Sequence, residues 1–212
     1  MIDAVVFDFG GVFIGSPFEA LRAVGEEQGA SFDQTMAIVF GPYDLDTDHP
    51  WHQAERGQLD IVSTRDQILA LGREQGFEFD LFQMLKAIGG DGGVNEDMVA
   101  LVRRVRGQGL PTALLTNNVA EGRDFWQALL PIDELFDVTV DSSAVGMRKP
   151  DPRIYEHTLA ELGGVAPERA VFLDDFAGNI TAAEAVGMIG VLVEADATGA
   201  IARVDELLAS AR

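Results

Sequence analysis

Short, continuous runs of apolar residues bounded by turn-forming residues constrain the fold of this chain more than any other feature. Strands that are buried on both faces carry such sequences, because neither face of a covered parallel sheet meets solvent. A weaker run covers Asp137–Asp141, and four stronger ones are rich in Val, Ile, Leu and Phe: Ala4–Phe9, Thr112–Leu115, Ala170–Leu173 and Ile189–Val193. These runs predict the strands of a parallel sheet.

Helical patterns alternate with these runs. The clearest pattern, Asn95–Gln108, begins with an asparagine and two acidic residues and is followed by Gly109, which is the expected polarity of a helix start and stop. Helical spacing also occurs in Tyr155–Leu162, Ile180–Val186 and Ile201–Leu208. Strands that alternate with helices favour right-handed βαβ units. We therefore expect an α/β fold with a Rossmann-like parallel sheet covered by helices.

The segment 16–93 has a different character. It contains no comparable apolar run, and it shows several short amphipathic patterns: Phe18–Glu27, Phe32–Val39, Thr64–Glu74 and Leu81–Ile88. The glycine-rich sequence Gly89–Gly93 that follows predicts a flexible joint and a hinge. We expect an α/β core formed by residues 1–15 and 94–212, and a small all-helical domain, residues 16–93, inserted after the first strand.

Composition and charge argue against several functional classes. The 212 residues carry a net charge of −20, which is unfavourable for binding nucleic acid, since the phosphate backbone requires clustered Lys and Arg. The sequence has no cysteine and hence no thiolate metal site. No stretch approaches the roughly 18 apolar residues that span a membrane, and the N-terminus lacks a signal-peptide pattern, so a cytoplasmic protein is expected. The choice between monomer and homodimer stays open.

Polar residues lie at the ends of two predicted strands. Asp8 comes near the end of the first run and precedes Gly10 and Gly11. In open α/β sheets, ligands bind beyond the carboxyl ends of the strands, and the N–H groups of a glycine-containing turn can face an anion. Thr116 and Asn117 follow the second run, and their hydroxyl and amide groups are good hydrogen-bond partners for phosphate oxygens.

Charged residues of both signs follow later in the chain. Lys149 stands before a proline in the sequence GMRKPDP, whose two prolines stiffen the segment and present the lysine from an ordered loop. Asp174 and Asp175 end another apolar run. Adjacent carboxylates repel each other unless a cation or hydrogen-bond donors compensate, and hard oxygen ligands of this kind suit Mg²⁺.

These elements together resemble, in the same order along the chain, the motifs of the haloacid dehalogenase (HAD) superfamily. The matching sequences are VVFDFGGVF, ALLTNN, GMRKPDPRIY and VFLDDFAGNITAAEAVGM, of which the last two are the most specific. The resemblance covers essentially the whole chain, and segment 16–93 falls where relatives carry a helical cap. The likeness is nearest to phosphatases similar to the epoxide hydrolase N-terminal domain and to sugar-phosphate phosphatases. It implies a small phosphorylated metabolite as substrate, whose identity is not given by the sequence.

The resemblance also implies a role for each residue. Asp8 would attack phosphorus and form an aspartyl-phosphate, while Lys149 would neutralise charge on the nucleophile and the phosphoryl group. Mg²⁺ would be held by Asp8, the carbonyl of Gly10 and Asp175, with Asp174 in that shell or beside it. The groups expected to bind the phosphoryl oxygens belong to Gly10, Gly11, Thr116, Asn117 and Lys149.

Gly10 departs from the family pattern. Most HAD phosphatases have a second Asp at this position, which protonates the leaving group and then activates water, and such help is worth about 10²–10⁴-fold. Either Glu55, His52 or His49 of the insertion supplies the proton, or the substrate has an acidic leaving group, as in an anomeric sugar, acyl or aryl phosphate. We favour the second, since it requires no additional residue. The histidines are expected to be surface or hydrogen-bonded side chains, and Glu55 a solvated partner of Arg56.

Two other functions stay open. A 2-haloacid dehalogenase shares the scaffold and the Asp nucleophile but needs no Mg²⁺, and the pair Asp174 and Asp175 speaks against it. A catalytically impaired protein that binds a phosphorylated ligand without turning it over is the other alternative, and Gly10 keeps it open.

Overall fold

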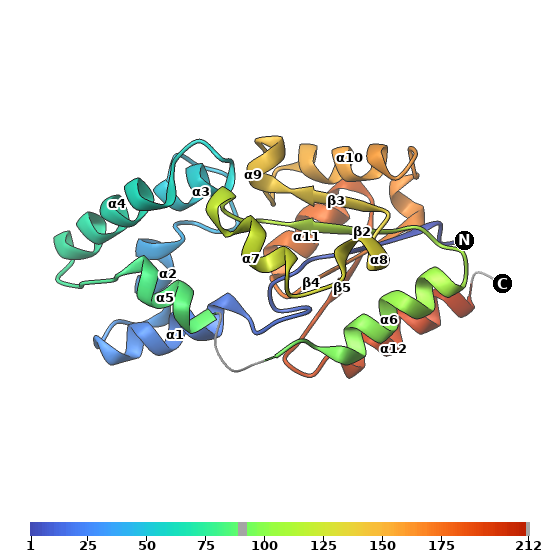
Figure 1. The fold of residues 1–212 in the computed structure, drawn as a ribbon, viewed down its shortest axis with the longest axis horizontal. Coiled ribbons are helices and arrows are strands. Elements are labelled where there is room, and N and C mark those ends of the chain that lie inside the picture. The colour runs from blue at the N-terminus through green and yellow to red at the C-terminus, as the bar shows by residue number, and fades with distance from the viewer. Residues whose placement is uncertain (89–92, 211–212) are drawn as a thin grey trace.

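The core of the protein is a five-stranded parallel sheet with the strand order β3-β2-β1-β4-β5. The computed structural model describes residues 1–88 and 93–210, and Figure 1 shows the arrangement of its elements. The strands are β1 (Ala4–Phe7), β2 (Thr112–Thr116), β3 (Val138–Asp141), β4 (Ala170–Asp174) and β5 (Ile189–Leu192). All five lie within a residue or two of the predicted runs, so the predicted α/β fold is confirmed.

Helices cover both faces of the sheet. On one face, α6 (Glu96–Gly107), α8 (Ile132–Leu135) and α12 (Thr198–Ala209) pack against alternate strand residues such as Val5 and Phe7. On the other face, α10 (Pro152–Glu161) and α11 (Ala177–Val186) pack against a separate cluster that includes Val6 and Phe172. Because both faces are covered, every residue of β1, β2 and β4 is buried.

A group of helices is inserted between β1 and β2, as the sequence predicts, and forms a lobe at one end of the molecule (Figure 1). This lobe is called the cap below. Its helices are α1 (Pro17–Glu27), α2 (Phe32–Val39), α3 (Pro50–Glu55), α4 (Ile61–Glu74) and α5 (Leu81–Ile88). The cap has its own apolar cluster, in which Leu21, Ile38 and Ile68 are buried. The exact domain boundaries remain a prediction, and residues 89–92 of the predicted joint lie outside the described residues.

Local sequence explains where several cap helices begin. The side chains of Ser16, Ser31 and Asp60 accept hydrogen bonds from main-chain N–H groups in the first turns of α1, α2 and α4. Ser31 and Gln34 form a reciprocal capping box. Helix α3 is not indicated by apolar spacing, because only six residues form it and its sequence, PWHQAE, is largely polar.

Four further short helical segments complete the chain between the strands. They are η1 (Ala120–Gly122), α7 (Arg123–Gln127), α9 (Ser142–Val145) and η2 (Pro167–Arg169). Among the described residues, no helix combines the length and apolar character that crossing a membrane requires. The parallel topology brings the carboxyl ends of all strands to the edge of the sheet that faces the cap, and the candidate site lies there.

Candidate active site

Three strand ends bring the predicted site residues to one place. Asp8 follows β1, and its N–H donates to the carbonyl of Leu173 in β4 at 2.8 Å, so it stands beside the carboxyl end of that strand. Thr116 is the last residue of β2 and Asp174 the last of β4. Carboxylate oxygens of Asp8, Asp174 and Asp175 lie within 4.8 Å of one another. The topology thus gathers residues that are far apart in the sequence.

Lys149 joins two of these carboxylates. Its Nζ lies 2.8 Å from Asp8 Oδ1 and 2.6 Å from Asp174 Oδ2, and its side chain is 1% exposed. Burial disfavours the ammonium ion, but the charges of Asp174 and Asp8 outweigh this effect and raise the pKa of Lys149. The lysine therefore remains positively charged in a buried position next to the expected nucleophile.

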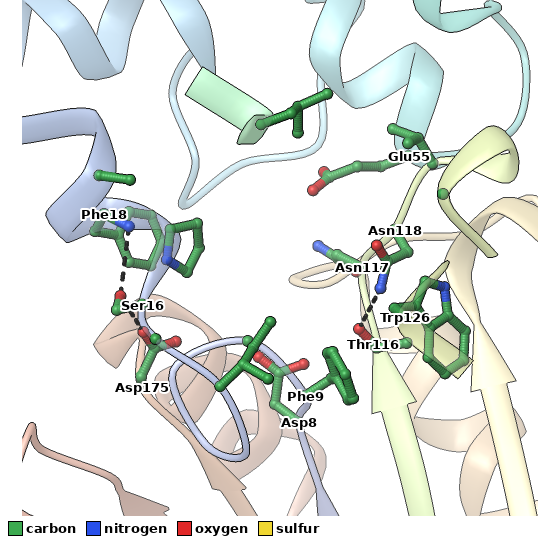
Figure 2. A pocket seen from close by; sticks show the side chains of 18 of the residues that line it. Asp8, Phe9, Ser16, Phe18, Glu55, Thr116, Asn117, Asn118, Trp126 and Asp175 are labelled. Atoms are coloured by element: carbon green, nitrogen blue, oxygen red, sulfur yellow. Dashed lines mark hydrogen bonds between the residues drawn. The ribbon is translucent and has the colours of Figure 1, made fainter. Parts of the chain in front are cut away.

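The loop that carries Lys149 is held by Asn117. Asn117 Oδ1 accepts a hydrogen bond from the main-chain N–H of Lys149 at 2.8 Å, and its Nδ2 donates to the carbonyl of the same residue at 3.0 Å. The Asn117 side chain is thus engaged by the main chain of the loop. The neighbouring Thr116 Oγ1 accepts from Asn118 Nδ2 at 3.0 Å, and Thr116 faces the cavity described below (Figure 2).

Asp174 has both carboxylate oxygens occupied. Its Oδ1 accepts from the N–H of Phe176 at 2.8 Å, Asn179 Nδ2 lies 3.1 and 3.0 Å from the two oxygens, and Oδ2 accepts from Lys149. Asp174 is therefore well placed to orient Lys149. Asp175 differs, because from the side chains that the structure describes it accepts one hydrogen bond, at Oδ2 from Ser16 Oγ at 2.6 Å.

The three carboxylates carry more negative charge than their surroundings balance. Burial raises the pKa of Asp8 well above its usual range, and Asp174 and Asp175 raise it further, while Lys149 lowers it. Burial and the charge of Asp174 raise the pKa of Asp175 to about 7. Three clustered carboxyl groups beside a single ammonium group form a donor set that fits a divalent cation with oxygen ligands.

The two glycines after Asp8 face different constraints. Gly11 has a φ of +69°, and a Cβ there would lie 2.0 Å from Asp175 Oδ2, so only glycine fits against the acidic cluster. Gly10 has an ordinary φ, and a Cβ there would meet Pro17 Cδ at 3.5 Å, a normal contact distance. The backbone at position 10 thus accepts a Cβ, so glycine is not required there by backbone conformation or by contact at that atom.

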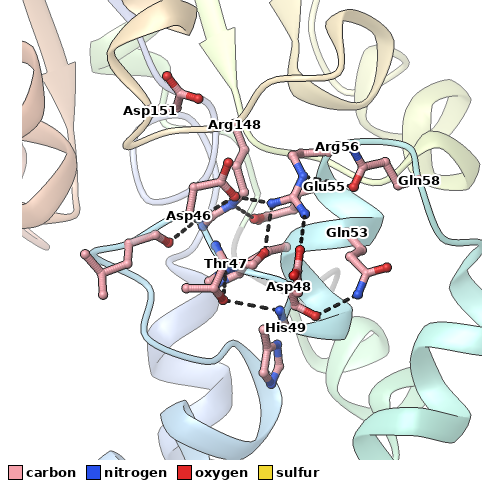
Figure 3. A network of polar contacts seen from close by, with 12 residues as sticks. Asp46, Thr47, Asp48, His49, Gln53, Glu55, Arg56, Gln58, Arg148 and Asp151 are labelled. Carbon is pink, nitrogen blue, oxygen red and sulfur yellow. Dashed lines mark hydrogen bonds and ion pairs between the residues drawn. The ribbon is translucent and has the colours of Figure 1, made fainter.

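The cap residues considered as proton donors are placed differently from the sequence expectation. Glu55 is 1% exposed, so the predicted solvated pair with Arg56 is wrong. Its Oε2 accepts from Arg148 Nε at 2.7 Å and its Oε1 from the Tyr43 hydroxyl at 3.2 Å. Arg56 pairs instead with Asp46 (Figure 3). The cause is a partner distant in the sequence, since Arg148 comes from the loop before Lys149 and is itself fully buried.

The histidines of the cap are poor proton donors in this setting. Burial lowers the pKa of His49 to about 4 and that of His52 to about 3. His52 is fully buried, and its Nδ1 accepts from the N–H of Thr47 at 3.1 Å. Both imidazoles are therefore neutral near pH 7 and hold the turn before α3.

A cavity of about 940 Å³ opens above Asp8, between the sheet edge and the cap. Figure 2 shows Asp8 at its floor, Asp175 and Phe18 on one side, and Thr116 and Trp126 on the other. Its size lies within the range of small-molecule sites, which is about 300–1,000 Å³. The site therefore has room for a ligand much larger than phosphate.

Three residues with evident structural roles were not singled out from the sequence. Ser16 holds Asp175, Asn179 holds Asp174, and Arg148 joins the Lys149 loop to the cap. Asn179 lies inside the motif DDFAGN and Arg148 lies next to Lys149, so their positions in these motifs could have indicated a role at the site. Ser16 gave only the signal of a helix start, and its partner lies 159 residues away.

Comparison with known proteins agrees with these features. A family model described as haloacid dehalogenase-like hydrolase matches residues 2–187. The chain is 38% identical, over 97% of its length, to acyl-CoA dehydrogenase family member 10 of Mus musculus, of which it spans 19%. It is 29% identical to the sesquiterpene phosphatase astK of Aspergillus oryzae, over 88% of this chain and 87% of that protein. A HAD family enzyme of Bacteroides thetaiotaomicron, solved with magnesium and inorganic phosphate, has a similar fold, with a TM-score of 0.62 and 20% identity over 92% of this chain and 96% of that one.

Proposed function

The chain belongs to the haloacid dehalogenase-like hydrolases, and on that premise we propose that it is a Mg²⁺-dependent phosphatase that hydrolyses a phosphomonoester through an aspartyl-phosphate on Asp8. The observation that carries the proposal is the contact of a buried ammonium group, Lys149 Nζ, with Asp8 Oδ1 at 2.8 Å, beside a cluster of carboxylates. Phosphoryl transfer depends mainly on positioning and on charge stabilisation, and this arrangement supplies both.

The first step is attack by Asp8. One carboxylate oxygen of Asp8 forms a bond to phosphorus while the bond from phosphorus to the ester oxygen breaks, and the leaving group departs with that electron pair. Lys149 neutralises negative charge on the nucleophile and on the phosphoryl group. In the second step water attacks phosphorus and releases a proton to solvent, the bond from phosphorus to Asp8 breaks, and phosphate is released with the Asp8 carboxylate restored.

The cation site is proposed to use Asp8, the carbonyl of Gly10 and Asp175. These groups would hold Mg²⁺, whose positive charge would polarise the phosphoryl oxygens. Asp174 is placed beside this site, because its two carboxylate oxygens already accept hydrogen bonds from Lys149, Phe176 and Asn179. The group that Asp174 positions is Lys149.

Phosphoryl binding is proposed for the remaining residues of the sheet edge. Thr116, the last residue of β2, lines the cavity. Its hydroxyl group is proposed to bind the phosphoryl oxygens together with the main-chain N–H of the next residue, Asn117. Gly10 and Gly11 form the turn after Asp8, where N–H groups can face the phosphoryl oxygens. The Asn117 side chain acts on the Lys149 loop instead.

The leaving group must depart without help from position 10. The cap residues do not replace the missing acid: His49 and His52 do not line the cavity and are neutral, and both oxygens of Glu55 accept hydrogen bonds from Arg148 and Tyr43. These contacts support a substrate whose leaving group is acidic enough to depart unprotonated, such as an aryl, acyl or anomeric sugar phosphate.

The test is hydrolysis of a chromogenic aryl phosphate with Mg²⁺ and with a chelator, for the wild-type protein and Asp8→Asn. We expect turnover that requires both Mg²⁺ and Asp8. Release of halide from a 2-haloacid without Mg²⁺ would instead identify a dehalogenase. A melting temperature raised by phosphate, with no turnover of any ester, would identify the binding protein that Gly10 keeps open.

A further inference from the structure

The cavity above Asp8 has a wall of aromatic rings that pack against one another in tilted and edge-to-face pairs. Its members come from α1, the end of α2, the loop between α2 and α3, α3 itself and the residue after Asp175. Neighbouring ring centroids are 5.0 to 6.0 Å apart. They are Phe18, Phe40, Tyr43, Trp51 and Phe176, and all five line the cavity. This wall is called the aromatic wall below. Its rings present apolar surface directly beside the proposed phosphoryl site.

The opposite side of the cavity is also apolar. Phe9 and Trp126 of the core pack with ring centroids 5.4 Å apart, and Leu129 and Phe125 continue the surface from the same region. Figure 2 shows Phe18 and Trp126 on opposite sides of the space above Asp8. A bound molecule would therefore contact apolar side chains on two sides.

The lining offers little to a charged or strongly polar group. Away from the sheet edge, its charged members are Glu19, Glu55 and Glu121, and Glu55 is already paired with Arg148. Among the lining residues in the described part of the chain there is no Arg, Lys or His. A carboxylate or a second phosphate on the substrate would thus enter apolar surroundings without a cationic partner, which is costly.

We propose that this cavity binds the organic group of the substrate, and that this group is uncharged and hydrophobic. The proposal rests on the phosphatase function proposed above and specifies its substrate class. The preferred substrate is then a phosphomonoester of a hydrophobic phenol, bound by the aromatic wall and the Trp126 side. Sugar phosphates, whose hydroxyl groups need many hydrogen-bond partners, fit this lining poorly.

Two exposed phenylalanines support the assignment. Phe82 of α5 is 42% exposed and Phe125 of α7 is 58% exposed, and both line the cavity from different lobes. A hydrophobic ligand that extends from Asp8 between the lobes would cover part of their exposed surface, and burial of apolar surface stabilises a complex.

The first test is a series of para-alkylphenyl phosphates, from methyl through propyl to pentyl. All have nearly the same leaving group, so differences in kcat/KM report on binding of the alkyl chain. We expect kcat/KM to rise about three- to fourfold for each methylene that becomes buried, and to fall when the chain ends in a carboxylate. A flat series, or equal rates with the carboxylate analogues, would overturn the proposal.

A second test does not depend on catalysis. The two tryptophans of the chain, Trp51 and Trp126, both line the cavity, so tryptophan fluorescence reports on its occupancy. Titration with para-pentylphenol should change the fluorescence, while para-carboxyphenol should not. Binding of the apolar phenol with no ester hydrolysis would refute the phosphatase function and leave the cavity assignment standing. Hydrolysis without apolar preference or binding would do the reverse.

Variants can locate the binding. Phe125→Ser should reduce kcat/KM for the pentylphenyl ester about fivefold. The ligand would cover about one face of the Phe125 ring, and this contact contributes about half of the free energy gained when a whole phenylalanine side chain is buried. Val62→Ser is the matched control, because Val62 is 55% exposed and lies on α4 outside the cavity lining. An equal effect of both substitutions on the pentylphenyl ester would contradict the proposed location.

Discussion

An aspartate at position 10 should restore protonation of the leaving group. Gly10 lines the cavity next to Asp8, its backbone is not in the left-handed region, and a Cβ added there would meet no atom closer than Pro17 Cδ at 3.5 Å. A Cβ at position 10 therefore displaces none of its neighbours. A carboxyl group there is two residues from the nucleophile, where a general acid can reach the ester oxygen.

The size of the effect depends on the leaving group. General acid–base help is worth about 10²–10⁴-fold when the leaving group is a poor one, so Gly10→Asp should increase kcat/KM by that factor for an alkyl phosphate. For an ester of a phenol considerably more acidic than tyrosine, whose pKa is about 10, the increase in kcat/KM should be close to none. The difference in log(kcat/KM) between variant and wild type should therefore grow steadily with the pKa of the leaving group. The parameter kcat/KM covers the transfer to Asp8 and not the later attack of water, which an aspartate at position 10 would assist for every ester.

The assay is steady-state hydrolysis of a graded series of aryl and alkyl phosphates under saturating Mg²⁺. Gly10→Asn is the matched control, since it has the shape of Asp but cannot transfer the proton. Gly11→Ala is a second control that should lose activity, because its Cβ would overlap Asp175. A change in kcat/KM of the same size for all esters in Gly10→Asp, or an equal gain in Gly10→Asn, would contradict a role of this aspartate in protonating the leaving group.

The contacts around the site lead to three further predictions. Arg148→Met and Glu55→Gln each break the buried ion pair, and each should lower the free energy of unfolding by about 3–5 kcal/mol. The double variant should recover much of this loss. Denaturant titration measures all three variants, and additive losses would contradict the pairing. Asn179→Ala should lower kcat about tenfold with little change in KM, because Asp174 then holds Lys149 less firmly; a change confined to KM would argue against this role. Burial raises the pKa of Asp175 to about 7. Between about pH 4 and 7 the metal-free folded protein therefore keeps a proton on Asp175 that the unfolded chain has released. The contribution of Asp175 to the free energy of unfolding consequently falls as the pH rises through that range. Mg²⁺ requires the ionised carboxylate, so the rise in melting temperature caused by Mg²⁺ should be larger at pH 8 than at pH 6, and a rise independent of pH would exclude Asp175 as a ligand.

Those parts of the fold that depend on local sequence could be predicted. The apolar runs identify β1, β2 and β4 most clearly, because strands covered on both faces need such runs whatever their partners are. The edge strands β3 and β5 are only partly buried, and the run for β3 is correspondingly weaker. The cap helices with an apolar face can be predicted because the spacing of their apolar residues is itself a local pattern. Helix α3 cannot, since it has only six residues and half of them are polar. The strand-end positions of Asp8, Thr116 and Asp174 follow directly from the parallel topology.

The contacts that tune the site could not be predicted in the same way. Glu55 and Arg148 are 93 residues apart, and nothing in the sequence around Glu55 distinguishes a buried partner from the adjacent Arg56. The same holds for Ser16 and its distant partner Asp175. Such pairs depend on how the cap packs on the core, which is set by many weak apolar contacts together and not by a local pattern.

The proposed phosphatase mechanism requires that Asp8 carries the phosphoryl group during turnover. The most direct measurement is rapid acid quenching of the enzyme with an aryl phosphate and Mg²⁺, followed by peptide mapping by mass spectrometry. We expect one phosphoryl group on the peptide that contains Asp8, formed at least as fast as steady-state turnover and absent in Asp8→Asn. Full hydrolytic activity of Asp8→Asn, or a phosphoryl group found on another residue at that rate, would contradict it.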